Sequence, residues 1–279
     1  MPETTNQGSA FDLTAVQEAA CVHTRKIFDS CQSKDCMEDL RFYPTVSSED
    51  VIEQALSVKS GQAELLYVLV NVEPIGLNQG YYTIDLRFFY RVTCDAYTGA
   101  VRPTPVTGLA VFDKRCVLFG SQGSSQEFSS DTSYTVLEGG TLPTGNGLPT
   151  AVIEAVDPIV LALQLVSTAD VPGGDEPGLT EIPAAIAAAF EEPISFSSTT
   201  SRRIYATLGQ FSLLRLERET QLLLPIYDYC MPEKECTCDT NETDPCDIFQ
   251  QVDFPVGQFF PPSSAADLDA AAPLRRSLI

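Results

Sequence analysis

The stretch Gly80–Tyr97, "GYYTIDLRFFYRVTCDAY", decides the fold class of this chain. Apolar side chains occupy every second position from Tyr82 to Ala96, and most positions between them carry polar or charged residues such as Asp85 and Arg87. Because the side chains of a β-strand point alternately to opposite faces, this pattern predicts a long strand with one buried face. The stretch therefore indicates a β-sheet that covers a core.

The segments around this strand have the composition of antiparallel partners. Residues 63–75 are rich in Val, Leu and Tyr, and the connection "GLNQG" that follows them is typical of a β-hairpin. Residues 106–120 and 202–220 predict further strands, the second with a bulge at Gly209, where the apolar parity changes. Residues 151–167 predict a strand that Pro158 divides.

Helical signals are sparse, with short helices expected within residues 47–61 and 182–190. Loops rich in Gly, Pro, Ser and acidic residues separate the strands. The sequence thus predicts a mainly β protein with an antiparallel β-sandwich-like core, long loops and one or two short helices. We expect an N-terminal arm over residues 1–45, a β-rich core over 46–226, and a Cys-rich acidic segment with a tail over 227–279.

The charge of the chain bears on its partners. The formal net charge is −21, from 38 acidic and 17 basic residues, and a protein this acidic would repel the phosphate backbone of nucleic acids. We therefore expect no nucleic-acid partner. The first residues contain neither a basic region nor an apolar region, and the apolar runs are too short to span a membrane. We expect synthesis in a cytoplasm without a signal peptide.

The sequence contains no recognisable catalytic constellation. The single histidine, His23, lies beside Cys21, but adjacency in sequence does not create a catalytic dyad. Nucleophile elbows, phosphate-binding glycine loops and zinc-protease motifs do not occur. We expect a protein that is not an enzyme and needs no cofactor.

Nine cysteines remain to be explained. Cys94 lies on the apolar parity of its strand, which predicts a small buried side chain, and Cys116 also falls within a strand. The other seven lie in polar segments towards the two ends of the chain. On exposed arms such thiols would be suited to disulfide cross-linking between subunits. These seven are Cys21, Cys31, Cys36, Cys230, Cys236, Cys238 and Cys246.

A metal site is the alternative use of the C-terminal cysteines. Four thiolates could hold zinc or another thiophilic ion within one subunit, although their C-x5-C-x-C-x7-C spacing differs from the paired knuckles of structural zinc sites. The candidate ligands are Cys230, Cys236, Cys238 and Cys246.

Four stretches carry a resemblance to a known family. They are "RKIFDSCQSKDCMEDLRFYPT" (25–45), "VNVEPIGLNQGYYTIDLRFFYRVT" (70–93), "AVFDKRCVLFGSQG" (110–123) and "LPIYDYCMPEKEC" (224–236). Over roughly residues 20–240 the chain resembles a clostridial family of cysteine-containing spore-surface proteins, similar to the cysteine-rich basal-layer protein of the exosporium. It departs from that pattern in having fewer cysteines and an insertion at residues 168–180.

The resemblance implies a structural role. It implies a self-assembling protein of a spore outer layer, exosporium or coat, that is made in the mother cell, deposited on the spore surface and oxidised after that cell lyses. The partner would then be the protein itself, in a lattice, tube or filament locked by inter-subunit disulfides, with other spore-layer proteins as further partners.

Overall fold

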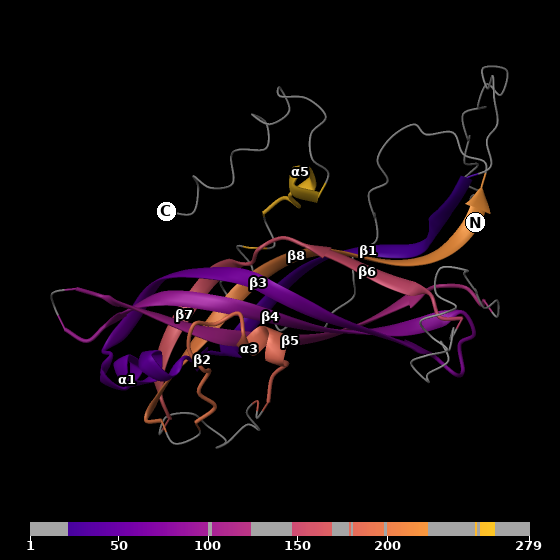
Figure 1. Cartoon of the computed structure of the whole chain (residues 1–279). Helices are drawn as coiled ribbons and strands as arrows, with labels where there is room; N and C mark the ends of the chain where they lie inside the picture. Colours follow the sequence, from indigo (N-terminus) through magenta and orange to yellow (C-terminus); the bar gives the residue numbers. More distant parts are fainter. Residues whose placement is uncertain are drawn as a thin grey trace.

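The chain folds into two antiparallel β-sheets that face each other as a sandwich. The computed structural model describes residues 22–99, 102–123, 147–168, 179, 181–197, 200–222, 249 and 252–259. The long strands of both sheets run along the axis of an elongated body, with α1 at one end (Figure 1). The prediction of a mainly β, sandwich-like fold is confirmed.

Sheet B contains β4, the strand predicted from the stretch Gly80–Tyr97. Its strand order is β2-β5-β4-β3, and every neighbouring pair is antiparallel. The expected hairpin is β3 and β4, paired from Ser57↔Tyr97 to Pro74↔Tyr82. The strands are β2 (Tyr43–Pro44), β3 (Ser57–Pro74), β4 (Tyr81–Tyr97) and β5 (Thr104–Phe119).

Sheet A is built around the longest strand, β8. One side of β8 pairs with β1 along almost its whole length, and the other side pairs with β6 and then β7, which lie end to end. Pro158 falls between β6 and β7, so the predicted division of this strand is confirmed. The strands are β1 (Val22–Arg41), β6 (Thr150–Ala155), β7 (Ile159–Ser167) and β8 (Arg202–Leu222).

The core lies between the inner faces of the two sheets. The even-numbered positions of β4, from Tyr82 to Ala96, are all buried, as their alternation predicted. They pack against the inner residues of β8, among them Ile204, Leu208 and Leu214. Since fully burying one large apolar side chain contributes about 1.5–3 kcal/mol, this layer supplies much of the folding free energy.

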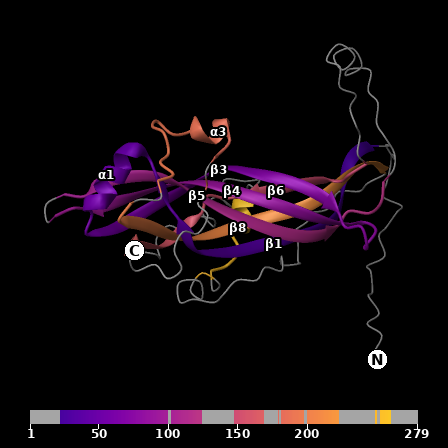
Figure 2. The ribbon, with the colours of Figure 1, turned by 90° about the horizontal axis from the view of Figure 1, so that it is seen from below.

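Short helices cover the periphery of the sandwich. Both expected regions contain one, although α1 ends before Leu56, whose side chain is 70% exposed. The segment that carries α3 lies against the outer face of sheet B (Figure 2). The helices are α1 (Val46–Gln54), α3 (Ala184–Ala187) and α5 (Val256–Phe259).

The expected N-terminal arm over residues 1–45 is wrong for its described part. Residues 22–41 form β1, which pairs with β8 over almost its whole length, so the folded core begins well before residue 46. The polar sequence of this strand misled the prediction, because Ser33 and Asp35 point inward and meet a polar partner from sheet B.

The C-terminal segment is also not simply an arm. Phe249 is 1% exposed, and the centroid of its ring lies 4.6 Å from that of Phe211. The ring centroid of Phe254 lies 5.5 Å from that of Phe211. These contacts place residues near α5 over the outer face of β8 (Figure 1). The rest of the predicted segment 227–279 lies outside the described residues.

The predicted bulge at Gly209 is not present. β8 continues through Gly209, and the register shifts nearest to it occur in its neighbours, between Met37 and Leu40 of β1 and between Val160 and Ala162 of β7. The apolar parity changes because β8 is buried on both faces here, with the Phe249 ring packed beside Gly209.

Gly108 allows β2 to approach β5 closely. A Cβ at this position would lie 2.6 Å from Cζ of Phe42, and the carbonyl oxygen of Tyr43 is also in contact range. We expect Gly108→Ala to lower the free energy of unfolding by about 1–3 kcal/mol, because the crowded backbone must shift. Denaturant unfolding measures this, with Gly76→Ala, which meets nothing within 4 Å, as the control. Equal unfolding midpoints for the two variants would contradict the packing described.

Candidate functional site: the open face of sheet B

The outer face of sheet B is covered over only part of its length. At one end, Phe89 and Leu109 are buried beneath Ile186 and Phe190 of the α3 segment. Arg91 strengthens this cover, since its guanidinium group lies 5.5 Å from the Phe190 ring and donates a hydrogen bond to the carbonyl of Ala189. Beyond this cover the outward side chains of β3, β4 and β5 are exposed or partly exposed.

Four charged side chains occupy the centre of the exposed part. Arg87 donates to both carboxylate oxygens of Asp113, at 2.6 and 2.8 Å, and Arg115 donates to both of Asp85, at 2.6 and 3.2 Å. We call Asp85, Arg87, Asp113 and Arg115 the charge quartet. They line a shallow, open groove of about 730 Å³ together with residues 69–71 of β3.

The register of the sheet creates the quartet. Asp85 lies directly opposite Arg115 and Arg87 directly opposite Asp113, so like charges sit on the diagonals of a square. Hydrogen bonds to the facing carboxylates raise the pKa of both Arg87 and Arg115. These pairs remain largely in water, and exposed ion pairs typically contribute only about 0.2–1 kcal/mol each. Their arrangement is therefore more informative than their contribution to stability.

Large apolar side chains flank the quartet at both ends. Tyr67 and Leu69 of β3 are 55% and 41% exposed, and Val117 of β5 is 50% exposed. Tyr81 and Phe119 form an edge-to-face pair at a centroid distance of 5.2 Å. We define the open face of sheet B as the quartet together with these five residues. Exposed aromatic and aliphatic side chains grouped around paired charges are typical of an interaction surface.

Cys31 and Cys36 are not available for cross-linking between subunits. Cys31 is 1% exposed and Cys36 is 6% exposed, and both are disulfide-bonded. Five residues apart along one strand, they are separated by about 16 Å, while disulfide-linked Cα atoms lie within about 7 Å. The two cysteines are therefore not bonded to each other, and each takes part in a separate disulfide. The prediction that these two thiols lie on an exposed arm is wrong.

The remaining cysteines divide into two groups. Cys94 is 1% exposed, as predicted, and burial, followed by the charge of Asp95, raises its pKa to about 12. Cys116 is also a buried thiol. The other candidates lie outside the described residues, and so do the alternative metal ligands. Within the described part of the chain, no group of three or more His, Cys, Asp or Glu side chains could hold a metal ion. The other candidates are Cys21, Cys230, Cys236, Cys238 and Cys246.

A buried polar cluster inside the sandwich was not predicted. Lys114 of β5 points into the core and contacts Ser33 and Asp35 of β1, so it joins the two sheets. One signal was present in the sequence: Lys114 lies on the apolar parity of its strand, between Phe112 and Cys116. Its partner could not be predicted, because the pairing depends on how the sheets stack.

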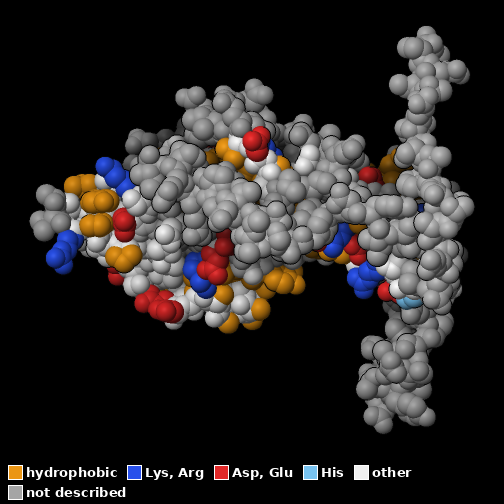
Figure 3. Space-filling view, turned by 90° about the horizontal axis from the view of Figure 1, so that it is seen from above, with side chains coloured by type: hydrophobic (Ala, Val, Ile, Leu, Met, Phe, Trp, Pro, Cys, Tyr) orange, Lys and Arg blue, Asp and Glu red, His pale blue; other side chains and the backbone are white. Residues whose placement is uncertain are grey.

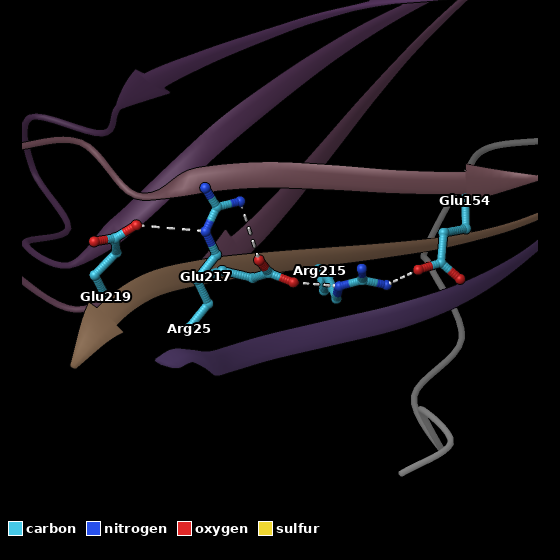
Figure 4. Close-up of polar contacts among 5 residues, drawn as sticks. All are labelled: Arg25, Glu154, Arg215, Glu217 and Glu219. Atoms are coloured by element: carbon cyan, nitrogen blue, oxygen red, sulfur yellow. Dashed lines mark hydrogen bonds and ion pairs between the residues drawn. The ribbon is translucent and has the colours of Figure 1, made fainter. Parts of the chain in front are cut away.

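The outer face of sheet A carries a ladder of ion pairs (Figure 4). Arg215 bonds to Glu154 and Glu217, and Arg25 lies 3.9 Å from Glu217 and 3.6 Å from Glu219. His23, also considered as a catalytic residue, lies 3.5 Å from Glu219 and is 58% exposed. Basic and acidic side chains also lie next to one another on the face shown in Figure 3.

Comparisons of this chain with protein-family models, with curated proteins and with solved structures give no match. None of the helices in the described residues has the length and apolar content needed to cross a membrane. The functional conclusion therefore depends on the geometry of the chain itself.

Proposed function

We propose that this protein is a structural subunit that assembles with copies of itself through the open face of sheet B. The observation that carries the proposal is the charge quartet, in which Asp85 and Arg87 on β4 face Arg115 and Asp113 on β5. If a second copy is turned face to face about an axis parallel to the strands, every Asp falls opposite an Arg. The face is thus complementary to itself.

The electrostatics of the whole chain favour this face over others. The formal charge is −21, so most approaches of two copies are repulsive. The quartet carries two positive and two negative side chains, and its flanks are apolar. Contact through this face therefore adds no local repulsion to that of the whole chains, and it removes exposed aromatic and aliphatic side chains from water.

The size of the face indicates how strong the contact is. Its open part extends roughly 25 Å along three strands, which is small beside the 1,600 Å² or so that a standard interface buries. A single contact is therefore weak. A two-fold contact of this kind joins two copies and then closes, so a lattice or filament also needs a second contact elsewhere on the chain, and the affinities of the two contacts combine.

The disulfides of β1 support a role in an oxidising environment. Cys31 and Cys36 are both disulfide-bonded, and such bonds are rare in proteins that work in a reducing cytoplasm. Together with the resemblance of residues 25–45 to clostridial spore-surface proteins, this supports a place in a spore outer layer, after the mother cell has lysed. Cross-links between subunits would use cysteines outside β1.

The test is a change of charge on the open face. Arg87→Asp combined with Arg115→Asp makes the quartet wholly acidic, so we expect self-association to weaken at least tenfold, measured by sedimentation velocity over a range of concentrations. Electron microscopy should show assemblies of the wild type and none of the variant.

The control makes the same change of net charge on the other sheet. Arg25→Asp combined with Lys26→Asp replaces two exposed cations of β1 and should leave self-association intact. A wild-type protein that stays monomeric at every concentration, or a quartet variant that assembles like the wild type, would contradict the proposal.

A further inference from the structure

Lys114 and Asp35 form an unusually enclosed contact between the two sheets. The ammonium nitrogen Nζ of Lys114 lies 2.8 and 2.7 Å from Oδ1 and Oδ2 of Asp35, and both side chains are 3% exposed. Ser33 Oγ accepts a further hydrogen bond from Nζ. The two similar N–O distances place Nζ about 3 Å from Cγ, the carbon that joins the oxygens, and reacting atoms about 3–3.5 Å apart can form a bond once the carboxyl group turns its face towards the nitrogen.

The surroundings of this contact are dry. Tyr90 and Met37 are 0% and 2% exposed, and the Tyr90 hydroxyl donates to Sδ of Met37 at 3.5 Å. Burial, followed by the charge of Asp35, raises the pKa of Tyr90 well above its ordinary value. A low-dielectric site of this kind disfavours charged groups and excludes bulk water.

We propose that Lys114 and Asp35 become joined by an isopeptide bond after the sandwich has folded. The site that carries this proposal is the enclosed Lys114, Asp35 and Ser33 cluster between β5 and β1. The product would be a covalent link between sheets B and A that no reductant can break. This inference does not depend on self-assembly.

The reaction is a condensation that needs no other reactant. One proton passes from the Lys114 ammonium to the Asp35 carboxylate, which leaves an amine and a carboxylic acid. The nitrogen lone pair attacks Cγ, and the N–C bond forms. The second amine proton passes through the Ser33 hydroxyl to the departing oxygen, the C–O bond breaks, and one water molecule leaves. Escape of this water from a dry core then favours the amide.

The position of the bond would explain why a polar cluster is kept inside the core. A buried ion pair adds little net stability, because desolvation of both charges offsets their attraction. An amide removes both charges and leaves one N–H group, for which Ser33 Oγ is already in place as an acceptor. The cluster then contains no charged group, and the amide N–H has its acceptor in Ser33 Oγ.

The test is the mass of the full-length wild-type chain, measured after complete reduction and denaturation. We expect a mass lower than that of the sequence by one water molecule. Proteolytic digestion should yield a branched peptide that joins the strand around Asp35 to the strand around Lys114. A wild-type chain with the full sequence mass would overturn the proposal, and so would a water lost at any other pair of residues.

Variants locate the reacting atoms without requiring an activity. Lys114→Arg and Asp35→Ala should both retain their full sequence mass, while Glu64→Gln, which alters an exposed pair with Arg91, should lose one water like the wild type. In Asp35→Asn the same attack would release ammonia. Loss of ammonia from that variant supports attack at Cγ, and loss of water from it would overturn the assignment.

Discussion

Reduction of the two disulfide bonds of β1 is expected to lower the free energy of unfolding by about 4–8 kcal/mol, since each native disulfide typically contributes about 2–4 kcal/mol. Cys31 lies on the inner face of β1 and Cys36 on its outer face, so the two bonds hold opposite sides of one strand. Urea unfolding with and without a phosphine reductant measures the loss.

Single replacements separate the two bonds. Cys31→Ala and Cys36→Ala, each studied without reductant, should each lose about 2–4 kcal/mol. Cys94→Ala is the matched control, because Cys94 is equally buried but carries a thiol. If reductant left the midpoint of the wild type unchanged, the anchoring of β1 by disulfides would be wrong.

Asp35→Ala is expected to lower the free energy of unfolding by about 3–5 kcal/mol, because it leaves the Lys114 ammonium in the core without its carboxylate. The double variant Asp35→Leu with Lys114→Met leaves no charged group at this place in the core, so it should recover the part of the loss that the lone ammonium causes. Chemical denaturation of the three proteins gives the values. The account of the cluster fails if Asp35→Ala unfolds at the wild-type midpoint, or if the double variant is the least stable of the three.

The sequence predicted sheet B well because its alternation is simple. From Tyr82 to Ala96 one parity is apolar, and the structure buries that parity. The position of Lys114 on the inner face of β5 also follows from alternation, but its partner does not. Which residue meets it depends on the stacking of β1 over β5, and local sequence contains no information about that.

Sheet A was harder to predict because its central features depend on distant contacts. The sequence of β1 is typical of a solvated arm, because polar Ser33 and Asp35 occupy positions where a core strand usually has apolar residues. The change in the spacing of apolar residues at Gly209 is typical of a bulge. Nothing near Gly209 in the sequence indicates that Phe249 covers the outer face of β8 there. Both errors come from judging burial from neighbours along the chain.

The open face of sheet B was visible in the sequence only in part. Alternation places Asp85, Arg87, Asp113 and Arg115 on outward positions, but their square arrangement requires the register of β4 against β5. The cover over Phe89 requires the α3 segment, which follows much later in the chain. The candidate site is therefore a property of the folded sheet.

The most direct test of self-assembly through the open face mixes two opposite variants. One carries Arg87→Asp and Arg115→Asp, and the other carries Asp85→Arg and Asp113→Arg, so each quartet has four like charges. Sedimentation velocity should show that each variant alone is monomeric and that an equimolar mixture forms complexes containing both. A mixture that sediments as the sum of two separate monomers, beside a wild type that assembles, would contradict the account.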